Sequence, residues 1–305
     1  MTGVGLRDVT LRDGLQDEPP LSTEAKLAIF DALVVAGVTD LELTSFTRPD
    51  RVPAMADAHR LAEVVLAHAD GPRLWGLILN RRGAERAIGA GLGHLQFALS
   101  VSEAHNEENA GRSVANSLLE LEAIAALAAD TDAQIEVTLA TAFGCPFEGP
   151  VAATHVADVA EQVRELGVAN LSVADTIGTA VPTEVTDLVE QLLVRLAPVE
   201  IGVHLHDTRG LAMANALAGI AAGAVRVDGA LGGLGGCPFA PGASGNLPLE
   251  DLVHALDAMG VVTGIDLDKL LDASLLASEL VGRTPTSHLW KAGPRFARQA
   301  APPRW

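Results

Sequence analysis

The residues best suited to chemistry are two histidines in the stretch His204-Leu205-His206-Asp207. They follow the apolar run Ile201-Gly202-Val203, which is typical of a buried β-strand. Side chains alternate along a strand, so His204 and His206 project to the same side. Two neutral imidazoles that converge at a strand end provide half of a divalent-metal site. The alternative is a pair of structural histidines that hydrogen-bond to their neighbours.

Asp13 and Asn246 could complete a metal shell with the two histidines. The four side chains would supply one carboxylate, one amide and two imidazoles, and would leave room for water or substrate. Oxygen and nitrogen ligands without a thiolate suit Mg²⁺ or Mn²⁺, and these ligand types also permit Zn²⁺. Taken singly, Asp13 and Asn246 are equally well interpreted as ordinary turn residues.

Further charged residues stand at the ends of predicted strands. Arg12 precedes Asp13, and a permanently charged guanidinium beside a metal makes sense if an anionic oxygen, such as a developing enolate, lies between them. A salt bridge from Arg12 to Glu42 or Asp175 is the alternative, and both roles can coexist. The predicted site therefore includes Arg12, Glu42 and Asp175.

A glycine-rich stretch from Gly232 to Asn246 contains Cys237. Glycines on both sides of Cys237 indicate a tightly turned or moving lid, and a lid thiol can deliver or remove a proton. An inert small residue in a turn is the alternative. The stretch lacks a GxGxxG in register, so it does not indicate a dinucleotide site. Cys145 lies in a similar string, and we expect it to have a packing role.

Eight strand–helix alternations are expected to position these residues. The expected strands are 4–11, 39–43, 73–79, 94–100, 134–140, 169–173, 200–206 and 225–230. The expected helices are 22–37, 53–68, 81–90, 106–129, 151–166, 182–196, 211–222 and one that begins near residue 249.

This alternation predicts a single α/β domain, a (β/α)8 TIM barrel. A doubly wound open sheet is the less favoured prediction, because unusual polar residues follow six of the strands rather than gathering at a single switch point. We expect the barrel to span residues 1–262. An extra C-terminal helical segment and a loosely ordered tail, from 291 onward, should occupy 263–305.

Composition limits the class of protein. The 305 residues carry a formal charge of −18, which argues against nucleic-acid binding because that needs a basic surface. Two cysteines do not make a disulfide framework, so we expect a reducing, cytoplasmic location. The first 13 residues lack the pattern of a signal peptide, and there is no apolar run long enough for a transmembrane helix. We therefore expect no membrane partner.

Six short motifs occur in one order along the chain. They are Arg12–Gln16 (RDGLQ), Glu42–Phe46 (ELTSF), Gly144–Gly149 (GCPFEG), Asp175–Gly178 (DTIG), His204–Thr208 (HLHDT) and Gly233–Pro238 (GLGGCP). Together they resemble the 3-hydroxy-3-methylglutaryl-CoA lyase family of metal-dependent TIM-barrel lyases. Order and approximate spacing agree with that family from residue 6 to about residue 282.

The resemblance implies a carbon–carbon lyase for a small-molecule acyl-CoA. The reaction would be the retro-Claisen cleavage of 3-hydroxy-3-methylglutaryl-CoA, or a close 3-hydroxyacyl-CoA, to acetyl-CoA and a keto acid such as acetoacetate, as in leucine catabolism. The family's metal ligands fall on Asp13, His204, His206 and Asn246, with Mg²⁺ or Mn²⁺ as the cofactor. Family members are often homodimers, and we expect the segment after the eighth helix to form the contact.

The resemblance also implies roles for the other site residues. The family's enolate-stabilising arginine falls on Arg12, and its lid cysteine, the proton donor to the enolate, falls on Cys237. Glu42 and Asp175 match carboxylates that the family keeps beside the metal and substrate. The base that removes the hydroxyl proton is either Asp175 or His204.

One departure from the family concerns coenzyme A. Characterised lyases commonly have a lysine at the position of Pro19, near the CoA phosphates, and here two acids precede that proline. Arg48 and Arg51, or Arg81 and Arg82, are candidates to replace the missing charge. The acyl group therefore stays open, with a longer-branched glutaryl or a citramalyl thioester as alternatives. The loop 102–106 is expected to shape the acyl pocket.

Two other enzyme classes of the same superfamily are alternatives. A 4-hydroxy-2-oxo acid aldolase shares the barrel and the paired histidines, but the glycine loop with Cys237 is not expected there. A 2-isopropylmalate-type condensing synthase shares Arg12 and Asp13, but usually carries a regulatory domain for which we expect no room. A non-enzymatic binding barrel is the contrasting class, and it predicts no metal uptake.

Metal affinity should depend on pH if both histidines are ligands. Ligation needs neutral imidazoles, and histidine ordinarily titrates near a pKa of about 6.5. We therefore expect Mn²⁺ affinity, measured by titration, to fall between neutral pH and about pH 5. An affinity that stays constant over this range would contradict the two-histidine site.

Overall fold

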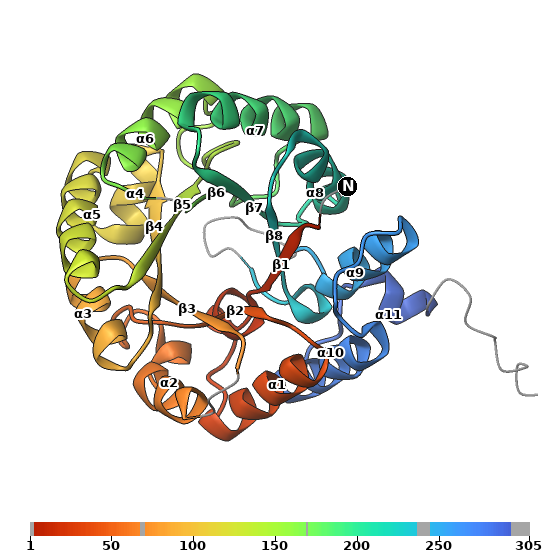
Figure 1. Cartoon of the computed structure of the whole chain (residues 1–305). Helices are drawn as coiled ribbons and strands as arrows, with labels where there is room; N and C mark the ends of the chain where they lie inside the picture. Colours follow the sequence, from red (N-terminus) through yellow and green to blue (C-terminus); the bar gives the residue numbers. More distant parts are fainter. Residues whose placement is uncertain (1–2, 68–70, 169, 237–244, 294–305) are drawn as a thin grey trace, which may run out of the picture.

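The structure, a computed structural model, describes residues 3–67, 71–168, 170–236 and 245–293. Eight parallel strands close into a barrel in the order β1 to β8, and β8 pairs with β1. Figure 1 shows this barrel along its axis, with the helices in a ring outside the strands. The predicted (β/α)8 barrel is therefore confirmed.

The strands are β1 Gly5–Asp8, β2 Asp40–Ser45, β3 Arg73–Ile78, β4 His94–Ser100, β5 Gln134–Ala140, β6 Asn170–Asp175, β7 Glu200–Leu205 and β8 Arg226–Gly229. The helices are α1 Thr23–Val35, α2 Ala58–Leu66, α3 Arg81–Gly89, α4 Glu103–Ala110, α5 Val114–Ala129, α6 Ala153–Glu165, α7 Pro182–Leu196, α8 Ala212–Ala222, α9 Leu249–Ala258, α10 Leu267–Val281 and α11 His288–Ala292. Three short turns of 3-10 or π type are η1 Thr10–Gly14, η2 Pro53–Met55 and η3 Leu231–Gly233.

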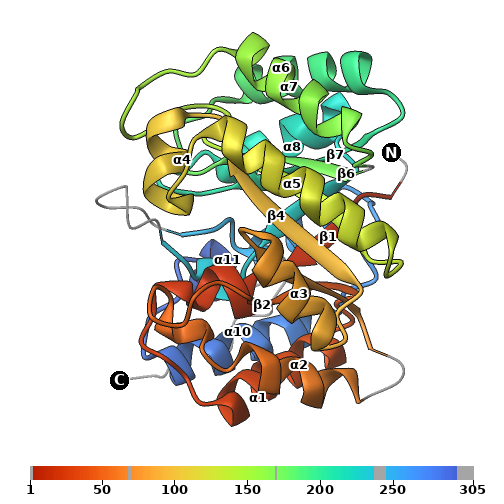
Figure 2. The same ribbon diagram turned by 90° about the vertical axis from the view of Figure 1, so that its left-hand side faces the viewer.

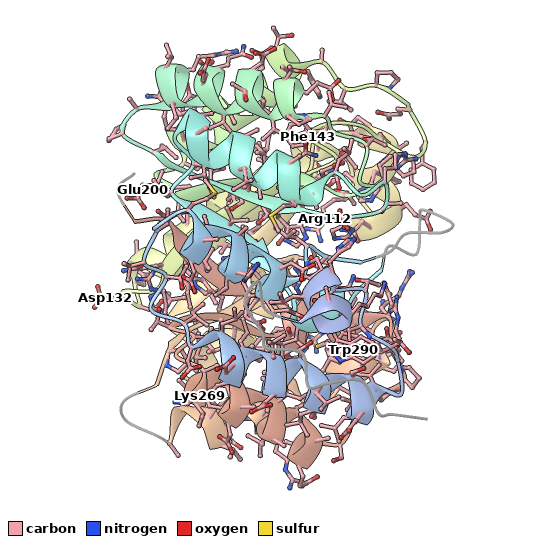
Figure 3. The ribbon with its side chains drawn as sticks, turned by 90° about the vertical axis from the view of Figure 1, so that its right-hand side faces the viewer. Arg112, Asp132, Phe143, Glu200, Lys269 and Trp290 are labelled. Atoms are coloured by element: carbon pink, nitrogen blue, oxygen red, sulfur yellow. The ribbon has the colours of Figure 1, made fainter. Side chains whose placement is uncertain are left out.

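The carboxyl ends of the strands meet at one face of the barrel, which we call the mouth. Figure 3 shows Glu200 and Asp132, at the amino ends of β7 and β5, on the opposite side of the molecule from Arg112 and Phe143. In the side view of Figure 2, α4 lies on the mouth side of the barrel. Functional residues at strand ends therefore gather at the mouth.

The first strand is shorter than the predicted range 4–11. It ends at Asp8, whose carboxylate accepts hydrogen bonds from the backbone N–H and the hydroxyl of Thr10, at 2.9 and 2.8 Å. Such local side-chain bonds compete with the strand ladder. The chain then forms the π-helical turn η1, in which the Gly14 N–H donates to the Val9 carbonyl, so Arg12 and Asp13 lie on a turn.

The helix predicted for residues 106–129 is two helices. α4 ends at Gly111, whose φ of 70° is left-handed and suits glycine. Ser113 then caps α5 by accepting from the Asn116 N–H. The break turns α4 toward the mouth, so its residues can line the active-site cavity.

The barrel interior is strongly polar, whereas the layer between strands and helices is aliphatic. Branched and small residues such as Leu41, Val137 and Ala160 fill the outer layer and are fully buried. Inside the barrel, Arg7 and Asp228 are also fully buried and form a two-point ion pair, with distances of 2.8 and 3.1 Å. Buried charges of this kind need partners on every side.

α9, the eighth helix of the barrel, packs against β8, and the C-terminal extension continues from it, with α10 beside α1 (Figure 1). The Asp266 N–H donates to the Ala36 carbonyl at 2.8 Å, which fixes the start of α10 at the end of α1. Of the predicted loose tail, Lys291 and Ala292 instead end α11, and residues 294–305 lie outside the described residues. Among the described helices, not one has the length and apolar character to cross a membrane.

Gly202 in β7 is a position where any side chain should destabilise the fold. A Cβ there would lie 2.6 Å from the Ser172 hydroxyl and 2.7 Å from the Arg226 guanidinium. We expect Gly202→Ala to lower the free energy of unfolding by roughly 1–3 kcal/mol, measured by urea denaturation. Gly89, at the end of α3, has open space around it, so Gly89→Ala should raise stability by up to about 1 kcal/mol. Equal effects of the two changes would contradict the packing described for β7.

Candidate metal centre and active site

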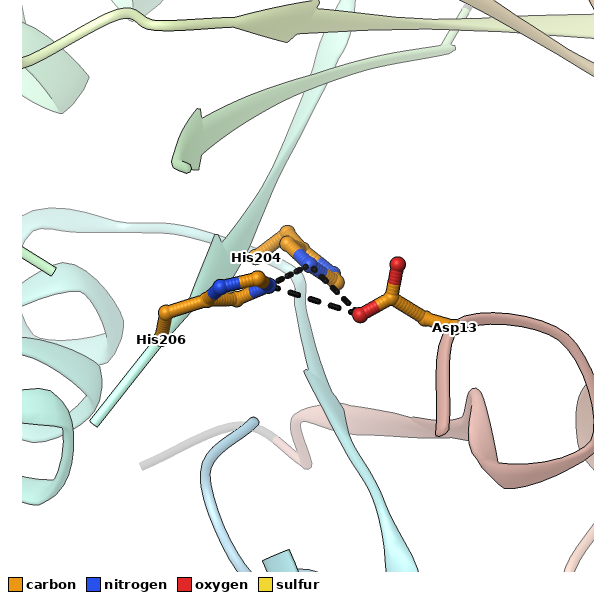
Figure 4. Close-up of side chains that lie close together, drawn as sticks. All are labelled: Asp13, His204 and His206. Atoms are coloured by element: carbon orange, nitrogen blue, oxygen red, sulfur yellow. Dashed lines mark hydrogen bonds and ion pairs between the residues drawn. The ribbon is translucent and has the colours of Figure 1, made fainter. Parts of the chain in front are cut away.

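His204 and His206 come together at the carboxyl end of β7. The strand ends at Leu205, and His206 forms an isolated bridge with Asn246 from the segment after β8. Both imidazoles are buried, and their Nε2 atoms lie 3.1 Å apart. Figure 4 shows the two rings converging on one point, as the strand alternation predicted.

Asp13 faces the two histidines from η1. Its Oδ2 lies 3.4 Å from His206 Nε2 and 3.9 Å from His204 Nε2 (Figure 4). Burial opposes ionisation, but the neighbouring Arg12 and the two imidazoles outweigh it and hold the pKa of Asp13 well below its usual range. Asp13 is therefore an ionised carboxylate at neutral pH.

Asn246 completes the cluster on the side of the glycine-rich stretch. Its amide nitrogen donates to Asp13 Oδ2 at 2.6 Å and to the Leu234 carbonyl at 2.9 Å. These bonds orient the amide, and its buried Oδ1 has no hydrogen-bond partner among the described residues. A buried acceptor without a donor is costly unless a cation or water binds it.

The donor set fits a divalent cation. One ligand atom each from Asp13, His204 and His206 lie within 4.8 Å of one another, and all three residues are buried. Two imidazole lone pairs that face each other repel unless a proton or a cation lies between them. These oxygen and nitrogen donors suit Mg²⁺ or Mn²⁺, and Asn246 reaches the cluster through its amide nitrogen, which donates to Asp13. The structure thus brings together all four predicted ligands.

Arg12 lies beside this cluster and is held between two carboxylates. One guanidinium nitrogen contacts Asp13, and another lies 2.8 Å from Glu42. The salt bridge considered as an alternative therefore exists, and Glu42 is its partner. Glu42 is fully buried and is not among the described residues that line the cavity, so its contact is with Arg12.

Asp175 ends β6 and is nearly fully buried. Its two oxygens accept from the backbone N–H groups of Thr179 and Ala180, at 2.8 and 2.9 Å. Burial raises the pKa of Asp175 above its ordinary value, against the effect of these hydrogen bonds. Its neighbours Ala174 and Thr176 line the cavity. Such a carboxylate is a stronger proton acceptor than an exposed one.

A cavity of about 750 Å³ opens from the metal-ligand cluster to the surface. Its wall includes Gln96, Ala98, Thr138 and Ala140 from β4 and β5, and several residues of α4. Its volume lies within the usual range for small-molecule sites. A ligand in this cavity would contact the cluster at one end and solvent at the other.

Two pairs of arginines were predicted as candidates to bind coenzyme A, and only one of them lies at the cavity. Arg48 and Arg51, which follow β2, line the cavity, as does Arg112 after α4. Arg81 instead pairs with Glu85 on the surface at 3.0 Å, and neither Arg81 nor Arg82 is among the described lining residues. The first pair is therefore the one placed to meet an anionic ligand.

Of the two cysteines, Cys145 and Cys237, the structure describes only Cys145. Cys237 lies outside the described residues, so its predicted role as a proton donor stays a prediction. Cys145 is buried, and its Sγ lies 2.9 Å from the Ser102 hydroxyl, as expected of a packing residue. Within the predicted loop 102–106, His105 is the residue that lines the cavity.

The described start of the glycine-rich stretch is anchored by three elements. The Gly232 N–H donates to the buried Glu250 carboxylate, at 3.0 Å, and the Gly232 carbonyl accepts from the Thr286 N–H, at 2.8 Å. The Leu231 N–H donates to the Thr10 hydroxyl at 2.8 Å. Gly232 has a φ of 61°, which favours glycine. The C-terminal extension thus contributes directly to the mouth.

Polar residues deeper in the barrel were not predicted from the sequence. Asp228 of β8 lies 3.2 Å from His204 Nδ1 and is paired with Arg7 and Arg226. Arg7 in turn contacts Glu136. Charged residues at alternate positions of strands that are otherwise apolar were the available signal. Such residues inside a barrel are expected to serve the site above them.

Barrel and site together define an enzyme with a metal-ligand set at its mouth, and comparisons with known proteins give the family. The family model described as HMGL-like matches residues 4–276. The chain is 40% identical to the (R)-citramalyl-CoA lyase of Chloroflexus aurantiacus, over 97% of this chain and 96% of that protein. It is 38% identical to a hydroxymethylglutaryl-CoA lyase of Bacillus subtilis, over 92% and 94% of the two chains.

A solved structure of an HMG-CoA lyase from Acinetobacter baumannii, in complex with coenzyme A and 3-methylmalate, superposes with a TM-score of 0.93. The identity is 38%, and the match covers 98% of each chain. The chain therefore belongs to the HMGL-like family, and it is an enzyme of the lyase class. The predicted resemblance is confirmed.

Glu250 should make stability depend on pH. Burial raises its pKa to about 7. The folded protein then keeps a proton that the unfolded chain releases, so stability falls as pH rises from the ordinary carboxyl value through about pH 7. The loss amounts to roughly 3 kcal/mol at about 1.4 kcal/mol per pKa unit. Glu250→Gln, which keeps an acceptor for Gly232, should remove this part of the pH dependence.

Urea denaturation at several pH values between about pH 4.5 and pH 8 measures this difference. Glu279→Gln, an exposed change on α10, is the control and should follow the parent protein. A Glu250→Gln variant with the parent's pH dependence would show that Glu250 ionises normally in the folded protein.

Proposed function

We propose that the protein cleaves a 3-hydroxyacyl-CoA by a metal-dependent retro-Claisen reaction. The substrate would be 3-hydroxy-3-methylglutaryl-CoA or (R)-citramalyl-CoA, and the products acetyl-CoA and a keto acid. The observation that carries the proposal is the buried cluster of Asp13, His204, His206 and Asn246 with Arg12 directly beside it. This juxtaposition provides for binding a hydroxy acid and for stabilising an enolate next to it.

Each group of site residues would have a separate role in the reaction. Asp13, His204, His206 and Asn246 would hold Mg²⁺ or Mn²⁺, which would supply Lewis-acid activation of a hydroxy acid. Arg12 is held rigid by Asp13 and Glu42 and would stabilise the negative charge of the acetyl-CoA enolate. Cys237 remains our candidate for the proton donor to that enolate.

Asp175 is favoured over His204 as the base that removes the hydroxyl proton. His204 has Nδ1 directed at Asp228 and Nε2 directed at the metal-ligand cluster, so neither ring nitrogen is left to accept a proton. Asp175 has a raised pKa and stands at the carboxyl end of β6, at the mouth, between the lining residues Ala174 and Thr176, although its own side chain is not among the described lining residues. A raised pKa improves a carboxylate as a general base.

Arg48 and Arg51 would take the place of the lysine that is missing at Pro19. Both line the cavity, and both are exposed residues of the loop after β2. Guanidinium groups suit the phosphates of coenzyme A because they bind phosphate oxygens in pairs. The proposal therefore assigns the CoA phosphates to this loop.

Two acyl groups remain candidates, because relatives of similar identity are named for each. The two acids differ in one methylene between the hydroxyl-bearing carbon and the carboxylate. Cleavage of the bond between C2 and C3 would give acetoacetate from one and pyruvate from the other. A place in leucine catabolism follows only from the first. We also retain the predicted homodimer and cytoplasmic location as parts of the proposal.

The direct test is to assay the purified protein with Mg²⁺ and each of the two thioesters. We expect acetyl-CoA release from at least one of them, accompanied by an equal amount of acetoacetate or pyruvate. Removal of the metal with EDTA should abolish the release, and added Mn²⁺ should restore it. Release that persists without metal would contradict the proposed chemistry.

Cys237→Ser separates the lyase from the aldolase alternative. The change should strongly reduce acetyl-CoA release, since a serine hydroxyl is a far weaker acid than a thiol. An aldolase that releases pyruvate from a 4-hydroxy-2-oxo acid would keep its activity. Unchanged acetyl-CoA release in this variant would remove Cys237 from the mechanism.

Replacement of Arg51 should weaken CoA binding without changing the chemical step. We expect Arg51→Ala to raise KM by about tenfold, roughly the 1.4 kcal/mol of one phosphate contact, and to leave kcat within about twofold. The control is Arg82→Ala, on the surface of α3, which should leave both constants unchanged. A fall in kcat at constant KM would show that Arg51 acts on the reacting atoms instead.

A further inference from the structure

Asp228 is a fully buried carboxylate one layer below the metal-ligand cluster. It lies on β8, next to β7 in the barrel. Its Oδ1 accepts from Arg7 Nε at 3.1 Å and Arg226 Nε at 3.2 Å, and its Oδ2 accepts from an Arg7 terminal nitrogen at 2.8 Å. The remaining contact of Oδ2 is His204 Nδ1, at 3.2 Å.

This contact decides which nitrogen of His204 carries the proton. Arg7 and Arg226 direct three N–H groups at Asp228, and these permanently charged guanidinium groups pair with its ionised form. An ionised carboxylate only accepts hydrogen bonds, so Nδ1 of His204 must be the N–H donor. The lone pair of the neutral ring is then on Nε2, the atom that faces His206 and Asp13.

We propose that Asp228 is a positioning residue for the metal centre, which holds His204 in the tautomer and ring orientation that presents Nε2 to the cation. The inference rests on the metal centre of the proposed function. A carboxylate behind a ligating histidine also makes the imidazole a stronger ligand. Asp228 itself does not touch the substrate.

Within the described part of the chain, His206 has no carboxylate behind its ring comparable to Asp228 behind His204. Its Nδ1 is buried and has no hydrogen-bond partner among the described residues. The two histidines are therefore unequal. Loss of Asp228 should act on the site through His204 alone, whereas a general disturbance of the barrel would affect both rings.

The same polar network also reaches the arginine beside the metal centre. When the Gln96 amide is oriented to satisfy its neighbours, its nitrogen donates to Glu42 at 2.6 Å and its oxygen accepts from Arg7 at 3.2 Å. Glu42 in turn holds Arg12 at 2.8 Å. Arg7 thus connects the support of His204 with the support of Arg12. The same buried hydrogen-bond and ion-pair network therefore supports both His204 and Arg12.

The test compares Asp228→Asn with a matched control, Glu136→Gln. Glu136 is also fully buried and contacts the same two arginines, Arg7 and Arg226, but no contact joins it to His204 in the described structure. Both changes replace one buried carboxylate by an amide against two guanidinium groups, so they should lower the unfolding temperature similarly. Only the first alters the partner of His204 Nδ1.

The measurement is the Mn²⁺ affinity of the metal-free, full-length protein, followed by electron paramagnetic resonance. We expect Asp228→Asn to weaken Mn²⁺ binding about 10–100-fold and Glu136→Gln to change it less than about threefold. Equal affinities of the parent protein and Asp228→Asn would overturn the inference, as would an equal loss in both variants. A parent protein that binds no Mn²⁺ would instead refute the proposed function itself.

A second readout isolates the tautomer from any loss of stability. Nitrogen NMR of histidine-labelled, metal-free protein at neutral pH distinguishes a protonated Nδ1 from a protonated Nε2. The parent protein and Glu136→Gln should show His204 with the proton on Nδ1, and Asp228→Asn should show a mixture of the two forms. A parent protein with the His204 proton on Nε2 would contradict the positioning role.

Discussion

The pairing of charges inside the barrel is the constraint on which the site depends. The network beneath and around the metal-ligand cluster contains four carboxylates and three guanidinium groups. The carboxylates are Asp13, Glu42, Glu136 and Asp228, and the guanidinium groups are those of Arg7, Arg12 and Arg226. Removal of one partner from such a buried pair costs about 3–5 kcal/mol, because it leaves the other charge uncompensated. The network as a whole keeps one negative charge in excess, which favours a cation at the ligand cluster.

Most of the fold and the upper part of the site could be predicted from the sequence. Alternation along a strand placed His204 and His206 on one side, and the barrel placed Asp13 opposite them. The prediction was wrong where local side-chain bonds decide the backbone. Asp8 ends β1 early by accepting from Thr10, and Gly111 separates α4 from α5, the long helix expected within residues 106–129.

The deeper part of the site could not be predicted in the same way. Asp228 and Glu136 stand in strands that look apolar, and their meaning depends on which strands become neighbours around the barrel. The contact between Gln96 and Glu42 likewise joins β4 to β2 across the interior rather than along the chain. Pairings of this kind follow from closure of the sheet, which a single sequence does not specify residue by residue.

In the proposed function, residues at the mouth of the barrel would set which substrate reacts. The ligand cluster and Arg12 would serve any 3-hydroxyacyl-CoA whose cleavage yields an enolate, so they would define the reaction more than the acyl group. The α4 segment, turned inward by the break at Gly111, and the loop with Arg48 and Arg51 form the outer wall of the cavity. We therefore expect the choice of acyl group and the binding of coenzyme A to depend on these two segments.

The central claim is that these four ligands bind one divalent cation beside Arg12. Anomalous X-ray diffraction from crystals soaked with Mn²⁺ tests it most directly, since the signal locates the metal independently of any assay. The account predicts one strong peak within bonding distance of the Asp13 carboxylate, both histidine Nε2 atoms and the Asn246 amide oxygen. A peak bound elsewhere, or histidines that bond only to each other in the presence of saturating Mn²⁺, would contradict it.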